Sequence, residues 1–161
     1  MSPTEKTLHD LEWPQLLEQL SARCTSDEAR ARALALAPAD TLDEARARAR
    51  RTAEALSLWN AAETLPYEGI PPVAEVIQRI ARQADASSFE LHAVRQMLRV
   101  ASALRRFGNA RRATYPALAA ALASDPGLDR LLGVLDHAID TDGTLADRAS
   151  HDLAAARRRV A

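Results

Sequence analysis

Apolar residues recur at intervals of three and four positions along most of this chain, which is the spacing of an amphipathic α-helix. The repeat is interrupted by residues that favour turns and helix ends, chiefly proline, glycine and serine. The pattern predicts helices over about residues 14–24, 27–36, 42–59, 73–80, 88–107, 116–123 and 128–135, and a last helix from residue 147 onward.

Two of these helices begin with a capping box, in which a serine or threonine and a glutamate three residues later satisfy each other's backbone N–H groups. Thr41 with Glu44 is the first box, and Ser87 with Glu90 is the second. Residues 64–72 contain three prolines and one glycine and therefore predict a loop. The two helices that follow this loop are close in sequence, so we expect them to form an antiparallel hairpin.

The composition favours the same fold class. Alanine, leucine, arginine and glutamate, all strong helix formers, dominate the 161 residues, whereas there are 5 glycines and aromatic residues make up 4%. A chain of this length usually forms one domain. We therefore expect an all-α protein, with residues 1–161 forming a single helical domain: a multi-helix bundle of antiparallel amphipathic helices.

The end of the chain has no helix stop signal. The last predicted helix begins around Asp147 and continues through residues 157–161, Arg-Arg-Arg-Val-Ala, without glycine or proline. We expect this helix to be truncated and the chain to be an amino-terminal fragment of a longer protein.

Charge offers one candidate binding surface. The chain has 21 basic and 22 acidic residues, so its net charge of −1 creates no overall attraction for nucleic acid or membranes. The most basic segment follows Glu90, which is the last acid before Arg112. Its candidate nucleic-acid-binding residues are Arg105, Arg106, Arg111 and Arg112. They could follow a phosphate backbone, with Tyr115 as a stacking surface, or they could pair with acids of neighbouring helices.

A second group of arginines lies on the helix predicted over residues 42–59, where basic and acidic residues are mixed. Such a run is typical of a solvated helix face with ion pairs between residues four positions apart. The basic members are Arg46, Arg48, Arg50 and Arg51.

Catalytic and metal-binding motifs are not found in the sequence. The turn Asp140–Gly143 resembles part of a calcium-binding EF-hand loop, but with Gly143 at the sixth position Ala138 and Ala149 occupy ligand positions. There is no Gly-rich phosphate loop, nucleophile elbow or zinc-protease motif. We expect no catalytic residue, cofactor or metal in this chain; the alternative of a small metal enzyme requires His137, His151 and Asp152 to converge.

Cysteine content and hydropathy bear on the compartment. The single cysteine, Cys24, cannot form an intrachain disulfide, and no stretch of eighteen residues is continuously apolar. We therefore expect a cytoplasmic chain without a membrane partner.

Several segments together resemble, in order, the amino-terminal region of the type-two branch of the bacterial MutS family, relatives of the DNA mismatch repair proteins. The most specific is the acidic-glycine turn at residues 139–143 followed by the helix start Asp147–Leu153. The other segments are Leu11-Glu12-Trp13, the helix with Leu16, Leu17 and Leu20, the capped helix from Thr41, the loop over 66–71, the helix start Ser88–Leu91 and Leu104-Arg105-Arg106-Phe107.

The resemblance implies a helical core, or lever, that leads into a long helix climbing to a clamp. In this branch the mismatch-reading domains are missing, an ATPase that uses ATP and Mg²⁺ drives homodimerisation, and a small MutS-related (Smr) endonuclease domain usually ends the chain. The whole protein acts on branched DNA, restraining recombination, or on stalled ribosomes. The clamp, ATPase and nuclease would lie outside this chain. The alternative is a free-standing helical adaptor that binds a protein partner through an apolar groove.

Overall fold

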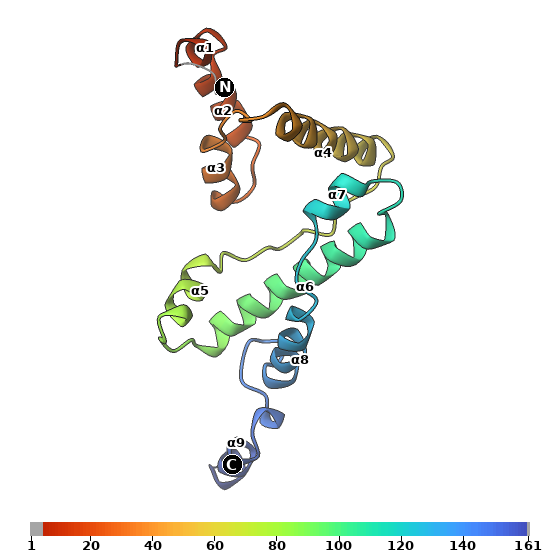
Figure 1. The fold of residues 1–161 in the computed structure, drawn as a ribbon. Helices are drawn as coiled ribbons and strands as arrows, with labels where there is room; N and C mark the ends of the chain where they lie inside the picture. Colours follow the sequence, from red (N-terminus) through yellow and green to blue (C-terminus); the bar gives the residue numbers. More distant parts are fainter. Residues whose placement is uncertain (1–4, 161) are drawn as a thin grey trace. The chain divides into compact units, whose positions relative to one another are not determined.

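The computed structural model describes residues 5–160, and within this range the backbone forms α-helices, one short 3-10 helix and no β-strand (Figure 1). An isolated bridge between Ile139 and Leu145 is the single extended pairing among these residues. The predicted all-α class is therefore confirmed.

The chain divides into two compact units, Met1–Ala53 and Glu54–Ala161. The boundary falls inside helix α4, Leu42–Asn60. Each unit has its own buried residues and is described separately below, and the single helical domain expected over residues 1–161 stays a prediction.

The first unit contains α1 (Glu5–Asp10), α2 (Trp13–Ser21), α3 (Asp27–Leu34) and the first part of α4. Helices α2 and α3 pack against each other, and each contributes one buried residue, Leu17 and Ala33. The indole N–H of Trp13 donates to the carbonyl oxygen of Leu36 over 3.2 Å. This bond links the start of α2 to the segment that follows α3.

Helix starts in this unit follow the sequence signals closely. The hydroxyl of Ser26 accepts a hydrogen bond from the Ala29 amide at 3.2 Å, and the Thr41 hydroxyl accepts from the Glu44 amide, also at 3.2 Å. The predicted box at Thr41 is displaced by one residue, because the Glu44 carboxylate accepts from the Asp40 amide. The other Glu44 oxygen pairs with Arg48, one of the four-residue ion pairs expected on this face.

The second unit is arranged around α6 (Ser88–Ala110), its longest helix (Figure 1). It also contains α5 (Ala74–Ala81), α7 (Pro116–Ala121), α8 (Leu128–Ala138), the 3-10 turn η1 (Asp147–Ala149) and α9 (His151–Val160). Helices α7 and α8 both pack against α6. Gly108 permits close approach of α7, because a side-chain carbon there would lie 3.2 Å from the Cα atom of Ala119.

The predicted capping box of α6 is complete. Ser87 accepts from the Glu90 amide, and the Glu90 carboxylate accepts from the Ser87 amide. The Ser87 backbone N–H is the main cause of the lowered pKa of Glu90, with a further contribution from Arg79 of α5. The ion pair between Glu90 and Arg79 also links the two helices of the predicted hairpin.

Arg95, in the middle of α6, fastens the end of α8. Its side chain is 97% buried and donates hydrogen bonds to the carbonyl oxygens of Ile139, at 2.5 Å, and Asp140, at 3.0 Å. It also donates to Nδ1 of His92 at 2.8 Å. Both carbonyls follow the last residue of α8, so the guanidinium supplies donors to backbone groups at the point where the chain leaves that helix.

Several helix limits differ from those predicted, most clearly towards the two ends of the chain. Residues before Pro14 form the extra helix α1, and α2 ends at Ser21 instead of Cys24. The last α-helix begins at His151, because Ser150 is extended and its hydroxyl accepts from the Asp152 amide, so Asp147 starts only a 3-10 turn.

The apolar residues that recur at helical spacing along α4 are not the buried ones. Leu42, Leu56 and Trp59 of this repeat are exposed, whereas Leu58, next to Trp59, is 3% exposed and forms the buried contact of this helix.

Replacing Arg95 with leucine tests its structural role. The change leaves the Ile139 carbonyl without its side-chain donor and removes the bonds to Asp140 and His92, although the Asp140 carbonyl keeps the Gly143 amide as a donor. We expect the free energy of unfolding to fall by about 3 kcal/mol. Urea denaturation followed by circular dichroism measures this loss. The control, Arg99→Gln, removes a half-exposed ion pair with Asp136 and should cost less than about 1 kcal/mol. Equal losses for the two variants would contradict the assigned role.

Candidate functional site

The structure places the four predicted arginines at one end of α6. Arg105 and Arg106 lie in its last two turns, Arg111 is the residue that ends the helix, and Arg112 follows directly. We call these four residues the arginine cluster. Two of their side chains form ion pairs, and the other two are exposed.

Arg105 is largely buried against α8. Its side chain is 11% exposed and forms an ion pair with Asp129 in the first turn of that helix. The hydrogen bond from Arg105 is the main cause of the lowered pKa of Asp129. Nη1 of Arg105 is buried without a hydrogen-bond partner. The guanidinium therefore helps to hold α8 on α6 and presents little surface to a ligand.

Arg111 lies between an aromatic ring and a carboxylate. Its guanidinium carbon is 3.8 Å from the centroid of the Phe107 ring, the geometry of a cation–π interaction. Its Nε atom donates to the carboxylate of Glu63, in the segment after α4. The Arg111 side chain nevertheless remains about one-third exposed.

Arg106 and Arg112 are the exposed members of the cluster. Neither forms an ion pair with a carboxylate of the described residues, and Arg112 donates to the side-chain oxygen of Asn109 at 2.7 Å. The cluster therefore divides into two kinds. Arg105 and Arg111 are paired with carboxylates, and Arg106 and Arg112 are available to a ligand.

Tyr115, expected as a stacking surface, stands at the start of α7, three residues after Arg112, and is half-buried. The start of α7 is held by Glu54, whose carboxylate accepts from the Ala117 amide at 3.2 Å and the Leu118 amide at 2.7 Å. Sequence reasoning missed Glu54 and Glu63, because their partners are about fifty to sixty residues away along the chain.

The residues of the alternative metal site do not come together. Within residues 5–160, no three histidine, cysteine, aspartate or glutamate side chains are close enough to hold a metal ion. His151 and Asp152 are both highly exposed, with 3.9 Å between their nearest side-chain atoms. In the acidic turn, the Asp142 carboxylate accepts from the amide and hydroxyl of Thr144, and these bonds lower the pKa of Asp142.

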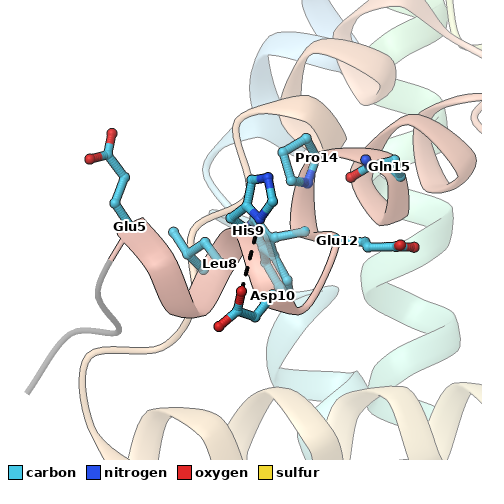
Figure 2. Close-up of a pocket in the computed structure, with 8 residues that line it drawn as sticks. Glu5, Leu8, His9, Asp10, Glu12, Pro14 and Gln15 are labelled. Carbon is cyan, nitrogen blue, oxygen red and sulfur yellow. Dashed lines mark ion pairs between the residues drawn. The ribbon is translucent and has the colours of Figure 1, made fainter.

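A hollow of about 570 Å³ lies between α1 and α2 in the first unit (Figure 2). Leu8, Trp13 and Pro14 form its apolar part, and no sequence pattern predicted this hollow. Figure 2 shows that the carboxylates of Glu5 and Glu12 extend to opposite sides. The polar groups therefore do not converge as they would in a catalytic site.

None of the described helices is long and apolar enough to cross a membrane. This finding concerns residues 5–160 only.

Comparison with known proteins gives one consistent result. The chain is 34% identical over 160 residues to endonuclease MutS2 of Anaeromyxobacter sp. (strain Fw109-5). This alignment covers 97% of the chain and 19% of the relative. The chain's identity is 31% over 160 residues to endonuclease MutS2 of Pelotomaculum thermopropionicum, covering 98% of the chain and 20% of the relative. The same protein of Thermomicrobium roseum is 32% identical over 153 residues, 93% of the chain and 19% of the relative. No family model matches the chain.

The similarity to these relatives extends over nearly the whole chain, which is therefore a MutS2-like segment. It spans about a fifth of their length.

The pairing of Arg105 with Asp129 can be tested by titration. Asp129 has a lowered pKa in the folded chain, so its pairing stabilises the fold at neutral pH and is lost as the pH falls below the ordinary value of 3.8. We expect Arg105→Gln to raise the pKa of Asp129 towards that value, measured by NMR of the carboxyl carbons. Arg99→Gln is the control and should leave the pKa of Asp129 unchanged. An unaltered Asp129 titration in Arg105→Gln would mean that the pair does not form in solution.

Proposed function

We propose that this MutS2-like segment is the non-catalytic helical core, or lever, of a MutS-like DNA-binding ATPase. The whole protein would act as a homodimer on branched DNA, restraining recombination, or on stalled ribosomes. ATP, Mg²⁺ and nuclease chemistry would belong to its other domains. The supporting observation is the similarity of nearly the whole chain to about one-fifth of proteins named endonuclease MutS2.

A lever has to move as one rigid body. The second unit is suited to this because two of its helices are packed on one long helix. Helix α6 has 23 residues and is therefore about 35 Å long. Buried contacts fasten α7 and α8 to it, and Arg95 ties the turn after α8 to its middle. Rigid elements of this kind transmit a change at one end to the other without reactive side chains.

The arginine cluster would add a secondary nucleic-acid contact. Arg106 and Arg112 are exposed and unpaired among the described residues, so their guanidinium groups can reach phosphate oxygens without first breaking an ion pair. Arg105 and Arg111 contribute positive charge nearby, although carboxylates partly neutralise them. Phosphate contacts release counterions, so binding should weaken steeply with salt.

The double variant Arg106→Gln/Arg112→Gln tests this contact. We expect it to weaken binding of a fluorescently labelled branched DNA, measured by anisotropy at low ionic strength. The slope of log affinity against log salt should fall by about 2, because two phosphate contacts are lost. Arg105→Gln/Arg111→Gln, with equal loss of charge, should have a smaller effect on binding and a larger effect on stability.

A matched control removes two arginines of the first unit, Arg50→Gln/Arg51→Gln, and should leave binding unchanged. If this control and the Arg106/Arg112 variant weaken binding equally, net charge alone drives binding and the assigned contact is wrong.

The helical adaptor remains a second candidate because α5 exposes apolar side chains. Helix α5 is strongly amphipathic, so its apolar face would normally be buried. Two residues of that face are exposed instead, Ile77 at 51% and Ile80 at 40%. An adaptor would bind a protein through this face. Its binding would be insensitive to Arg106→Gln/Arg112→Gln and sensitive to Ile77→Asp, so the two candidates predict opposite mutational patterns.

A further inference from the structure

We propose that an aromatic hollow beside the arginine cluster receives an unpaired nucleobase, so that the nucleic acid recognised by this segment contains single-stranded bases. The hollow lies at the end of α4 and includes Trp59, Glu63 and Tyr67. This inference rests on the proposed nucleic-acid function and deepens it by naming the form of nucleic acid.

The hollow has aromatic walls. Its volume is about 130 Å³, and Trp59, Tyr67 and the buried Leu58 all line it. Trp59 is 76% exposed and Tyr67 is 48% exposed. A second hollow, of about 370 Å³, adjoins it and shares Trp59, Glu63 and Thr64. The indole of Trp59 is thus accessible from both hollows.

The backbone fixes the position of these side chains. At the end of α4, Ala62 is in the left-handed conformation with φ of 57°, and its amide donates to the Trp59 carbonyl. The next amide, of Glu63, donates to the Leu58 carbonyl at 3.2 Å. These bonds close the helix end, so Trp59 and Glu63 are held at a tight turn in place of a flexible tail.

The arginine cluster places a cation at the edge of the hollow. Glu63, which lines both hollows, accepts a hydrogen bond from Arg111, whose guanidinium also lies over the Phe107 ring. Arg112 is the next residue and is exposed. An exposed planar aromatic surface next to arginines matches a nucleotide, which combines a planar base with a phosphate.

The charges argue against the other occupants of an aromatic hollow. A lysine or methylated lysine would bring a further positive charge beside Arg111 and Arg112, and the Glu63 carboxylate is already paired with Arg111. An apolar helix of a partner protein would gain nothing from the neighbouring guanidinium groups and would have to desolvate them. A base stacked on Trp59, with its phosphate towards Arg111 or Arg112, uses both features.

Binding of oligothymidylate and of an abasic oligonucleotide of the same length tests the proposal. Both probes carry the same phosphates, and only the first carries bases. At low ionic strength we expect oligothymidylate to bind about tenfold more tightly than the abasic probe, because stacking adds to the phosphate contacts. We also expect oligothymidylate to quench the emission of Trp59, identified as the signal that disappears in Trp59→Phe.

The variants separate stacking from folding. Trp59→Ala should reduce affinity for oligothymidylate about tenfold and leave the abasic probe unaffected. Trp59→Phe keeps a stacking ring and should retain most of the affinity. Leu56→Ala is the control, since Leu56 is exposed on the same helix but does not line the hollow, and it should change neither probe. Circular dichroism of each variant verifies the fold.

The outcomes also separate this inference from the proposed function. If Trp59→Ala binds both probes like the unmodified chain while Arg106→Gln/Arg112→Gln weakens both, the base site is wrong and the arginine contact stands. If the unmodified chain binds neither probe at low ionic strength, the base site is wrong, and binding of the branched DNA then decides the arginine contact separately. Quenching of Trp59 by an apolar helical peptide but not by oligothymidylate would overturn the base site in favour of a protein partner.

Discussion

The buried guanidinium of Arg95 is the interaction on which the arrangement of the second unit depends. It is a charge placed among packed helices, and it is tolerated because carbonyl oxygens of Ile139 and Asp140 and the ring nitrogen of His92 accept its hydrogen bonds. Those carbonyls end α8 and begin the turn that leads to α9. One side chain therefore fixes the route of the chain from α6 to the last helix, and Gly143, with φ of 86°, lets the turn pass close to the Phe89 ring.

The arginines of α6 form a series with different tasks. Arg95 is buried and donates from both of its terminal nitrogens, although its Nε atom has no hydrogen-bond partner. Arg99 and Arg105 are paired with Asp136 and Asp129 of α8. Arg106 and Arg112, further along, are exposed. Because α6 carries paired arginines and leads into exposed ones, its packing also determines where the exposed positive charges lie. Two exposed arginines and one exposed tryptophan suit the secondary contact proposed above better than an independent high-affinity binding site.

Nearly the whole chain is similar to MutS2 proteins, and its described residues form helices without a strand. The relatives are named endonucleases, and the chain spans about a fifth of their length. Within residues 5–160, many polar side chains form helix caps and ion pairs, and no three histidine, cysteine, aspartate or glutamate side chains lie close enough to hold a metal ion. The proposed function requires tightly packed helices, since a lever passes a movement at one end to the other end. The side-chain interactions of Arg95, Glu54 and Glu90 accordingly link one helix to another element.

The sequence by itself determined the class of fold, most helix starts and the location of the basic segment. These features depend on local physics: the helical spacing of apolar residues, the bonds of a serine or threonine to the third residue of its helix, and the conformational limits of proline and glycine. Tertiary structure alone decided which arginines were neutralised, because Arg105 and Arg111 meet acids 24 and 48 residues away. It also decided that Leu58 is buried and Trp59 exposed, since neighbouring positions on a helix point in different directions and only the packed partner selects between them.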